Sequence, residues 1–210
     1  MTKPMTGDSE GNSKKIVLDL CGGTGAWSKP YKDAGYDVRV ITLPDHDVLT
    51  YHPPKGVYGI LAAPPCTMFS RARTTAKTPR DFKGATEIVG ACLRIIWEAQ
   101  FEDRFGLKFW AMENPAGHLQ RFMGNPPFKF HPYDFGDRYS KQTFIWGMFK
   151  EPEKSPIKLN EHELLASRNN TRKLPPIPED YKRDGYMKPV QIRRSITPQG
   201  FANAFFKANQ

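Results

Sequence analysis

The chain has 210 residues, which is enough for one large α/β domain. Its hydrophobic content of 39% and aromatic content of 12% support a packed core and exclude wholesale disorder. The net charge of +9 favours a polyanionic partner. Three scattered cysteines exclude a disulfide framework and a zinc site, so we expect a reducing, cytoplasmic compartment and no metal. We expect no membrane partner, because no segment is long and apolar enough to span a bilayer.

The first part of the chain predicts two strands separated by a glycine turn and a helix. Residues 1–13 are polar and predict a disordered leader. The apolar run 16–20 predicts a buried strand, which enters the glycine-rich turn 21–25. Residues 26–34 fit a helix, and the β-branched residues of 36–42 predict a second strand.

The middle of the chain continues this alternation. A third strand is expected over 57–63, because the two prolines that follow cannot extend a sheet ladder. The basic segment 67–83 is expected to be an exposed loop. Apolar residues at helical spacing predict a helix over 85–100, and further strands are expected over 107–112 and 143–148.

The order of strands, turns and helices predicts a mostly parallel, doubly wound sheet with helices on both faces. A short amphipathic helix is expected over 200–208. Ligands of such sheets bind outside the carboxyl ends of the strands. Three polar motifs fall at these ends: Asp19 to Gly25, Pro64 to Cys66, and Glu113 to Pro115. We therefore expect the three motifs to converge on one crevice.

These motifs contain groups suited to catalysis and cofactor binding. Cys66 follows two prolines on a loop, where a thiol can act as a nucleophile; the alternative is a small buried hydrophobic residue. Glu113 can act as an acid; the alternative is a cap at a helix end. The glycine turn allows a cofactor to approach the backbone closely. A dinucleotide site is disfavoured, because Ser28 replaces the third glycine of that fingerprint.

The chain resembles the cytosine-C5 DNA methyltransferases in these three motifs and in their order: Asp19 to Gly25, Pro65–Cys66, and Glu113–Asn114–Pro115. The resemblance implies a Rossmann-like methyltransferase fold with S-adenosylmethionine as cofactor. It also implies that the Cys66 thiolate adds to carbon 6 of a cytosine flipped out of DNA, that Glu113 contacts ring nitrogen 3, and that carbon 5 accepts the methyl group.

The resemblance assigns residues to three roles. The catalytic residues are Cys66, Glu113 and Lys141, a lysine where the family has an arginine. The cofactor-binding residues are Asp19, Cys21, Gly22, Gly23, Gly25, Ala26, Trp27, Leu43, Asp45, Asp47 and Pro64. The DNA-binding residues are Ser70, Arg71, Arg73, Lys77 and Arg80.

Several positions depart from the family pattern. Cys21 replaces a phenylalanine, Leu43 replaces the glutamate that binds the ribose, with Asp45 nearby as a substitute, and Thr143 replaces a second arginine. Cys21 and Cys92 are both interpreted as core residues. Residues 124–128 mimic an Asn-Pro-Pro-Phe motif of amino-methylating enzymes, and we interpret them as a loop.

The resemblance divides the chain into a leader, a catalytic domain over 14–149, a proline-rich basic insert over 150–194 in place of a recognition domain, and a C-terminal helix over 195–210 that packs back on the catalytic domain. Without a recognition domain, we expect little sequence discrimination or a partner subunit that supplies it. Two alternatives remain open: a methyltransferase acting on RNA or a free cytosine nucleotide, and a catalytically silent DNA-binding or regulatory homologue.

Overall fold

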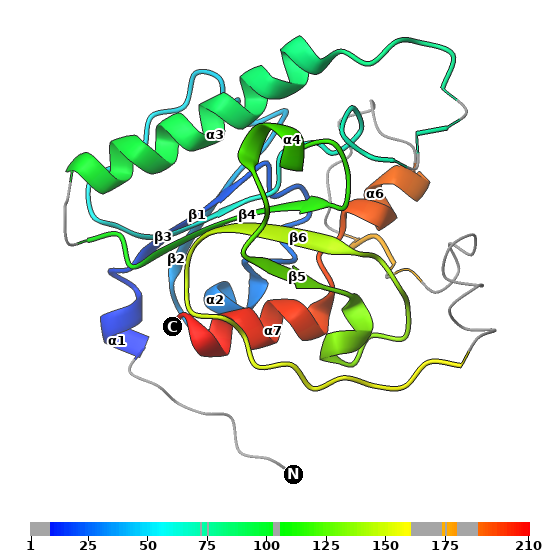
Figure 1. Cartoon of the computed structure of the whole chain (residues 1–210). Helices are drawn as coiled ribbons and strands as arrows, with labels where there is room; N and C mark the ends of the chain where they lie inside the picture. Colours follow the sequence, from blue (N-terminus) through cyan, green and yellow to red (C-terminus); the bar gives the residue numbers. More distant parts are fainter. Residues whose placement is uncertain are drawn as a thin grey trace.

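The computed structural model in Figure 1 describes residues 9–71, 73–74, 76–102, 106–160, 174, 176–179 and 189–210. Its centre is a six-stranded sheet with the strand order β2-β1-β3-β4-β6-β5. The strands are β1 (Ile16–Leu20), β2 (Asp37–Ile41), β3 (Val57–Ala62), β4 (Phe109–Pro115), β5 (Phe128–Phe130) and β6 (Thr143–Met148).

The sheet is mostly parallel. Strands β2, β1, β3 and β4 pair in parallel, whereas β6 runs antiparallel to both β4 and β5. This arrangement confirms the predicted α/β class and the five predicted strands. Strand β4 continues through Pro115, beyond the predicted end at residue 112, because its last residues pair with β6 up to Thr143. Glu113 therefore lies on the strand itself.

Helices cover both faces of the sheet, as Figure 1 shows, with α3 on one face and α2 and α7 on the other. Leu18 and Leu20 of β1 pack in the cluster that contains α3, whereas Val17 packs with the aromatic residues of α2 and α7. This alternation buries both faces of a parallel strand. The helices are α1 (Ser9–Asn12), α2 (Lys29–Asp33), α3 (Phe82–Glu102), α4 (Gln120–Met123), the 3₁₀ helix η1 (Pro132–Phe135), α6 (Pro189–Ser195) and α7 (Gln199–Ala208).

Helix α3 has the amphipathic pattern that the sequence predicts. Its residues Cys92, Ile95, Ile96 and Ala99 are buried against the sheet, which confirms the interpretation of Cys92 as a core residue. The helix is longer than predicted, because it begins at Phe82, inside the segment expected to be a loop.

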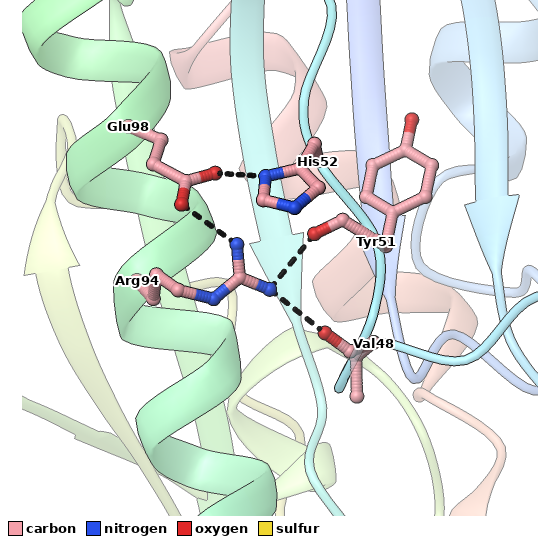
Figure 2. Close-up of polar contacts among 5 residues, drawn as sticks. All are labelled: Val48, Tyr51, His52, Arg94 and Glu98. Carbon is pink, nitrogen blue, oxygen red and sulfur yellow. Dashed lines mark hydrogen bonds and ion pairs between the residues drawn. The ribbon is translucent and has the colours of Figure 1, made fainter.

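Helix α3 also holds the connector between β2 and β3, as shown in Figure 2. The Arg94 guanidinium donates hydrogen bonds to the carbonyl oxygens of Val48 at 3.2 Å and Tyr51 at 2.8 Å. Glu98 accepts a hydrogen bond from Arg94 at 2.8 Å and lies 3.2 Å from Nδ1 of His52. The connector therefore packs on α3 through backbone contacts that a sequence pattern does not reveal.

The elements near the N-terminus differ in their bounds from those expected. Residues 9–12, within the predicted leader 1–13, form helix α1, and the Asn12 side chain donates a hydrogen bond to the carbonyl oxygen of Ala34 at 3.0 Å. Residues 1–8 of that leader lie outside the described residues. Helix α2 covers only Lys29–Asp33 of the predicted 26–34, because the glycine turn extends to Ser28.

Two elements were not predicted. Strand β5 begins at Phe128, at the end of a segment interpreted as a loop, and pairs with β6. Its three residues are too few to show an alternating pattern. Helix α6 lies in the predicted 150–194 insert and is fixed by its buried Ile192. Residues 161–173, 175 and 180–188 of that insert lie outside the described part. Helix α7, predicted over 200–208, is confirmed.

No helix among the described residues is long and apolar enough to cross a membrane.

Candidate functional site

Cys66 lies on a tight turn just beyond the end of β3. The buried Pro64 accepts a hydrogen bond through its carbonyl oxygen from the Asn114 side chain at 2.9 Å. The carbonyl oxygen of Cys66 accepts hydrogen bonds from the amides of Phe69 at 3.0 Å and Ser70 at 2.7 Å. The turn therefore holds the thiol in place, half-buried at the sheet edge.

Glu113 and Lys141 lie beside this turn. Lys141 precedes β6, which pairs with β4, and its Nζ atom lies 3.7 Å from Oε1 of Glu113. Both side chains are largely buried, at 22% exposed for Lys141 and 14% for Glu113. Lys141 Nζ also donates a hydrogen bond to the carbonyl oxygen of Arg194 at 3.1 Å, which brings the end of α6 to the site.

The pKa of the Cys66 thiol responds to both of these charged groups. Burial raises the pKa of Cys66, the positive charge of Lys141 lowers it, and the negative charge of Glu113 raises it. Both charges are therefore close enough to act on the sulfur. The structure brings together the three residues predicted to be catalytic.

The glycine turn after β1 has the left-handed backbone that the sequence suggests. Gly23 and Gly25 have φ angles of 54° and 67°, and Cys21, which is not a glycine, has a φ of 55°. A Cβ atom built at Gly23 would meet no other atom within 4 Å, so the turn leaves open space there. Close approach to this backbone is therefore possible for a ligand.

Asp19 lies beneath this turn and is fully buried. Its Oδ2 atom accepts a hydrogen bond from the Ser28 hydroxyl at 2.5 Å, whereas Oδ1 has no partner in the described part of the chain. Burial raises the pKa of Asp19 to about 6, an effect that the bond from Ser28 partly offsets. A Cβ atom on Gly22 would lie only 2.4 Å from Asp19 Cγ, so this glycine lets the carboxyl support the turn.

Trp27 is a core residue. Its ring packs against Phe201 and Phe205 of α7, with centroid distances of 5.8 and 5.4 Å. Its Nε1 atom is buried and has no hydrogen-bond acceptor among the described residues. Its neighbour Ala26 is half-buried in the turn. Cofactor contact by either residue stays a prediction.

Cys21 and the β2–β3 connector lie next to each other. Cys21 packs against the core cluster that contains Cys92, and the negative charge of Asp47 contributes to its raised pKa, after the larger effects of a hydrogen bond with Cys92 and of burial. Asp47 accepts a hydrogen bond from the Leu49 amide at 2.9 Å. Leu43 is 55% exposed and Asp45 is also exposed. The connector thus presents its predicted cofactor residues at the surface beside the glycine turn.

The basic loop after Cys66 is folded by two of its own arginines. Arg80 donates hydrogen bonds to the carbonyl oxygens of Met68 at 2.5 Å and Ser70 at 3.0 Å. Arg73 donates to the hydroxyl of Thr78 at 2.8 Å. Arg71 and Lys77 are exposed. Of the predicted DNA-binding residues, Arg73 and Arg80 therefore shape the loop, whereas Arg71 and Lys77 face solvent. The fifth, Ser70, forms a β-bridge with Gly117.

A pocket of about 390 Å³ lies between the segment that precedes Lys141 and the segment where α7 begins. Tyr139, two residues before Lys141, lines it, and burial together with the charges of Asp137 and Glu113 raises the tyrosine pKa. Asp137 also accepts a hydrogen bond from the Gly200 amide at 3.1 Å. The lining residues are Asp137, Arg138, Tyr139, Ile196, Thr197, Pro198 and Gln199.

Sequence reasoning missed Tyr139 and the role of Asn114. A weak signal existed for both: Tyr139 lies two residues before a predicted catalytic lysine, and Asn114 follows Glu113 in the motif. Neither signal specifies what the side chain contacts. Among the described residues, no group of three or more His, Cys, Asp or Glu side chains is placed to hold a metal ion.

Comparisons with known proteins find similarity at the level of structure. A crystal structure of the S. pombe Dnmt2 methyltransferase matches with 14% identity and a TM-score of 0.41, covering 83% of this chain and 58% of that chain. The DhpI-SAM-HEP complex matches with 15% identity and a TM-score of 0.25, covering 75% of this chain and 69% of that chain. This chain therefore spans 58% of the length of the Dnmt2 chain. No family model matches the chain, and no curated protein matches it.

Proposed function

We propose that this protein transfers a methyl group from S-adenosylmethionine to carbon 5 of cytosine in DNA through a covalent adduct with Cys66. The observation that carries the proposal is the meeting of Cys66, Glu113 and Lys141 at the ends of adjacent strands, with Glu113 and Lys141 3.7 Å apart. A thiol can add to an electron-poor ring, and a neighbouring carboxyl or ammonium group can give a proton to that ring or take one from it.

In this proposal Cys66 attacks as a thiolate. The new bond between sulfur and carbon 6 displaces the ring π electrons, which makes carbon 5 nucleophilic. A protonated Glu113 donates a hydrogen bond to nitrogen 3, so that negative charge does not accumulate on the ring. Burial and the charge of Glu113 raise the pKa of Cys66, whereas the positive charge of Lys141 lowers it and so favours the thiolate. After methyl transfer, a water molecule accepts the proton of carbon 5, the electrons of that carbon–hydrogen bond re-form the double bond between carbons 5 and 6, and the sulfur–carbon bond breaks to release Cys66 as a thiolate.

The glycine turn fits the proposed cofactor. The open backbone at Gly23 allows close approach, Asp19 supports the turn through the hydrogen bond that its Oδ2 atom accepts from Ser28, and the exposed Asp45 and Asp47 offer carboxylates beside it. When bound, S-adenosylmethionine supplies an electrophilic methyl group. We propose that the pocket between residues 137–139 and 196–199 is part of the same cofactor-binding region.

The basic charge of the chain supports DNA as the acceptor. The net charge of +9 and the exposed Arg71 and Lys77 on the loop that follows Cys66 suit phosphate contacts. Few side chains remain to read base edges, so we propose weak sequence discrimination or a partner subunit that supplies specificity.

The experiment measures transfer of a radiolabelled methyl group to cytosine-containing DNA by the full chain, and by the Cys66→Ser variant. We expect labelled 5-methylcytosine from the wild type and none from the variant. A fluorinated cytosine at the target position should trap the wild type covalently, since carbon 5 then has no proton to lose. Absence of product, or equal product from the variant, contradicts the proposal.

The acceptor is tested in the same assay. We expect DNA to be methylated in preference to RNA or free cytidine nucleotides, and product formation with DNA should fall as salt rises. Preferential labelling of RNA or of the free nucleotide would show that DNA is not the acceptor. It would not contradict the proposed chemistry at Cys66.

A further inference from the structure

A basic and aromatic surface lies beside the Cys66 turn, outside the pocket described above. The amide of His118 donates a hydrogen bond to the carbonyl oxygen of Phe69 at 2.8 Å, and Ser70 forms a β-bridge with Gly117. These contacts attach the segment after β4 to the turn that presents Cys66. We call this region the His118 surface, and it is formed by Arg71, His118, Arg121 and Phe122.

The ring of Phe122 is exposed and yet held by its neighbours. It is 55% exposed, whereas Phe69 beneath it is fully buried. The Phe122 ring contacts Phe69 edge-to-face at a centroid distance of 6.0 Å and Phe82 at 5.9 Å. The exposed part of an aromatic ring held in this way is a rigid apolar surface that another flat ring can cover at little entropic cost.

The surface around Phe122 is positively charged. Burial lowers the pKa of His118, and the positive charges of Arg80, Arg121 and Arg71 lower it further, which shows that these charges lie close together. Arg80 is engaged with backbone carbonyls. In the part of the chain that the structure describes, the side chains of Arg71 and Arg121 are exposed and make no hydrogen bond or ion pair, while the backbone amide of Arg121 donates a hydrogen bond to the carbonyl oxygen of His118 at 2.9 Å.

We propose that the His118 surface binds an unpaired DNA strand beside the target cytosine, with one base stacked on Phe122 and the phosphates contacted by Arg71 and Arg121. The proposal deepens the proposed function and rests on it for the position of the target base. An unpaired strand offers free base faces together with its phosphates, whereas the bases of a duplex are already stacked on each other. An exposed ring between cations therefore favours the unpaired strand.

The experiment measures binding by fluorescence anisotropy, without methyl donor, to a labelled single-stranded oligonucleotide and to the duplex of the same sequence. We expect Phe122→Ala to weaken single-strand binding about ten-fold, as loss of one stacked base does, and to change duplex binding little. Phe122→Tyr keeps the ring and should bind like the wild type. Arg121→Gln should weaken binding to both and reduce the salt dependence.

Phe101→Ala and Arg39→Gln are matched controls. Phe101 is another exposed aromatic residue, 67% exposed, and lies on α3 about 28 Å along the helix from Phe82. Arg39 is an exposed arginine on β2 at the far edge of the sheet. Neither change should affect binding of either DNA form.

Two results would overturn the proposal: unchanged single-strand binding by Phe122→Ala, or an equal loss on both DNA forms, since stacking on an unpaired base does not explain an equal loss from a duplex. The assay involves no methyl transfer, so its failure is distinguishable from failure of the proposed function. A wild type that methylates cytosine but binds DNA independently of Phe122 refutes the His118 surface only. A wild type without methyltransferase activity whose single-strand binding depends on Phe122 supports the surface and refutes the proposed function.

Discussion

The Asn114 side chain donates a hydrogen bond to the carbonyl oxygen of Pro64 at 2.9 Å, and this bond joins the turn that carries Cys66 to the strand that carries Glu113. Asn114 is fully buried, and its Oδ1 atom has no partner among the described residues. The bond lies between two parallel strands at the point where their backbone pairing ends. It therefore sets the position of the thiol relative to the carboxyl group.

Asn114→Ala should reduce both stability and activity. The change leaves the buried carbonyl of Pro64 without a donor, which costs about 1–3 kcal/mol in the free energy of unfolding, measured with urea. Asn209→Ala is a matched control, because Asn209 is also buried. Its side-chain amide accepts a hydrogen bond from the backbone amide of Lys150 at 2.8 Å and donates one to the carbonyl oxygen of Lys150 at 2.9 Å. We expect a similar loss of stability from the control, but a fall in kcat only from Asn114→Ala. Equal kcat in the two variants would show that the bond has no positioning role.

Lys141 and Glu113 should change the reactivity of Cys66 in opposite directions. The charge of Lys141 lowers the pKa of the thiol and that of Glu113 raises it. Lys141→Gln should therefore slow alkylation of Cys66 by iodoacetamide at pH 8, and Glu113→Gln should accelerate it. Mass spectrometry of the Cys66 peptide separates this reaction from alkylation of Cys21 and Cys92. Changes of the same sign in both variants would place at least one charge away from the sulfur.

Asp19 should make the protein less stable as pH rises through the range from about 4 to about 6. Its pKa is raised from 3.8 to about 6 in the folded state, so the folded protein retains a proton that the unfolded chain releases. The free energy of unfolding should therefore fall by about 2 kcal/mol from this group between pH 4.5 and pH 7.5, out of about 3 kcal/mol over its whole titration. Asp19→Asn should remove this component, as measured by urea unfolding at pH 4.5 and 7.5. Asp33→Asn, at an exposed ion pair with Lys29, is the control and should retain it.

Two glycines should respond oppositely to alanine. A Cβ atom at Gly117 would lie 2.3 Å from the carbonyl oxygen of Phe69, so Gly117→Ala must displace the loop that follows Cys66. We expect a loss of about 1–3 kcal/mol in unfolding free energy. Gly90 lies within α3 with no atom within 4 Å of such a Cβ, so Gly90→Ala should stabilise the protein by about 0.5–1 kcal/mol. Thermal unfolding of both variants gives the comparison, and a stable Gly117→Ala would contradict the packing of this loop.

Arg94→Met should loosen the connector that carries Asp45 and Asp47. The variant loses the hydrogen bonds to the carbonyls of Val48 and Tyr51 shown in Figure 2. We expect faster hydrogen exchange of the Tyr51 amide, which bonds to the Asp47 carbonyl within the connector. Lys55→Met removes a cation of the connector itself, one whose side chain is 89% exposed, and should leave the exchange rate unchanged.

Much of the fold is predictable because most residues of β1, β3, β4 and β6 are buried, on both faces of the sheet. Five runs of apolar and β-branched residues predicted strands that the structure contains, and the two prolines before Cys66 correctly marked the end of β3. Strand β5 was missed, because its three residues depend on pairing with β6 and have little pattern of their own. Helix α6 was missed for a similar reason, since one buried residue, Ile192, fixes it.

The sequence by itself determined which chemical groups the strand ends present, because a thiol after two prolines and a carboxyl group after an apolar run are local features. Only the tertiary structure decided which of those groups meet. Lys141 reaches Glu113 because β6 pairs antiparallel with β4, and Arg80 turns inward because backbone carbonyls of its own loop accept its hydrogen bonds. Such contacts join residues that are distant along the chain or depend on loop geometry, and neither leaves a periodic signal in the order of the amino acids.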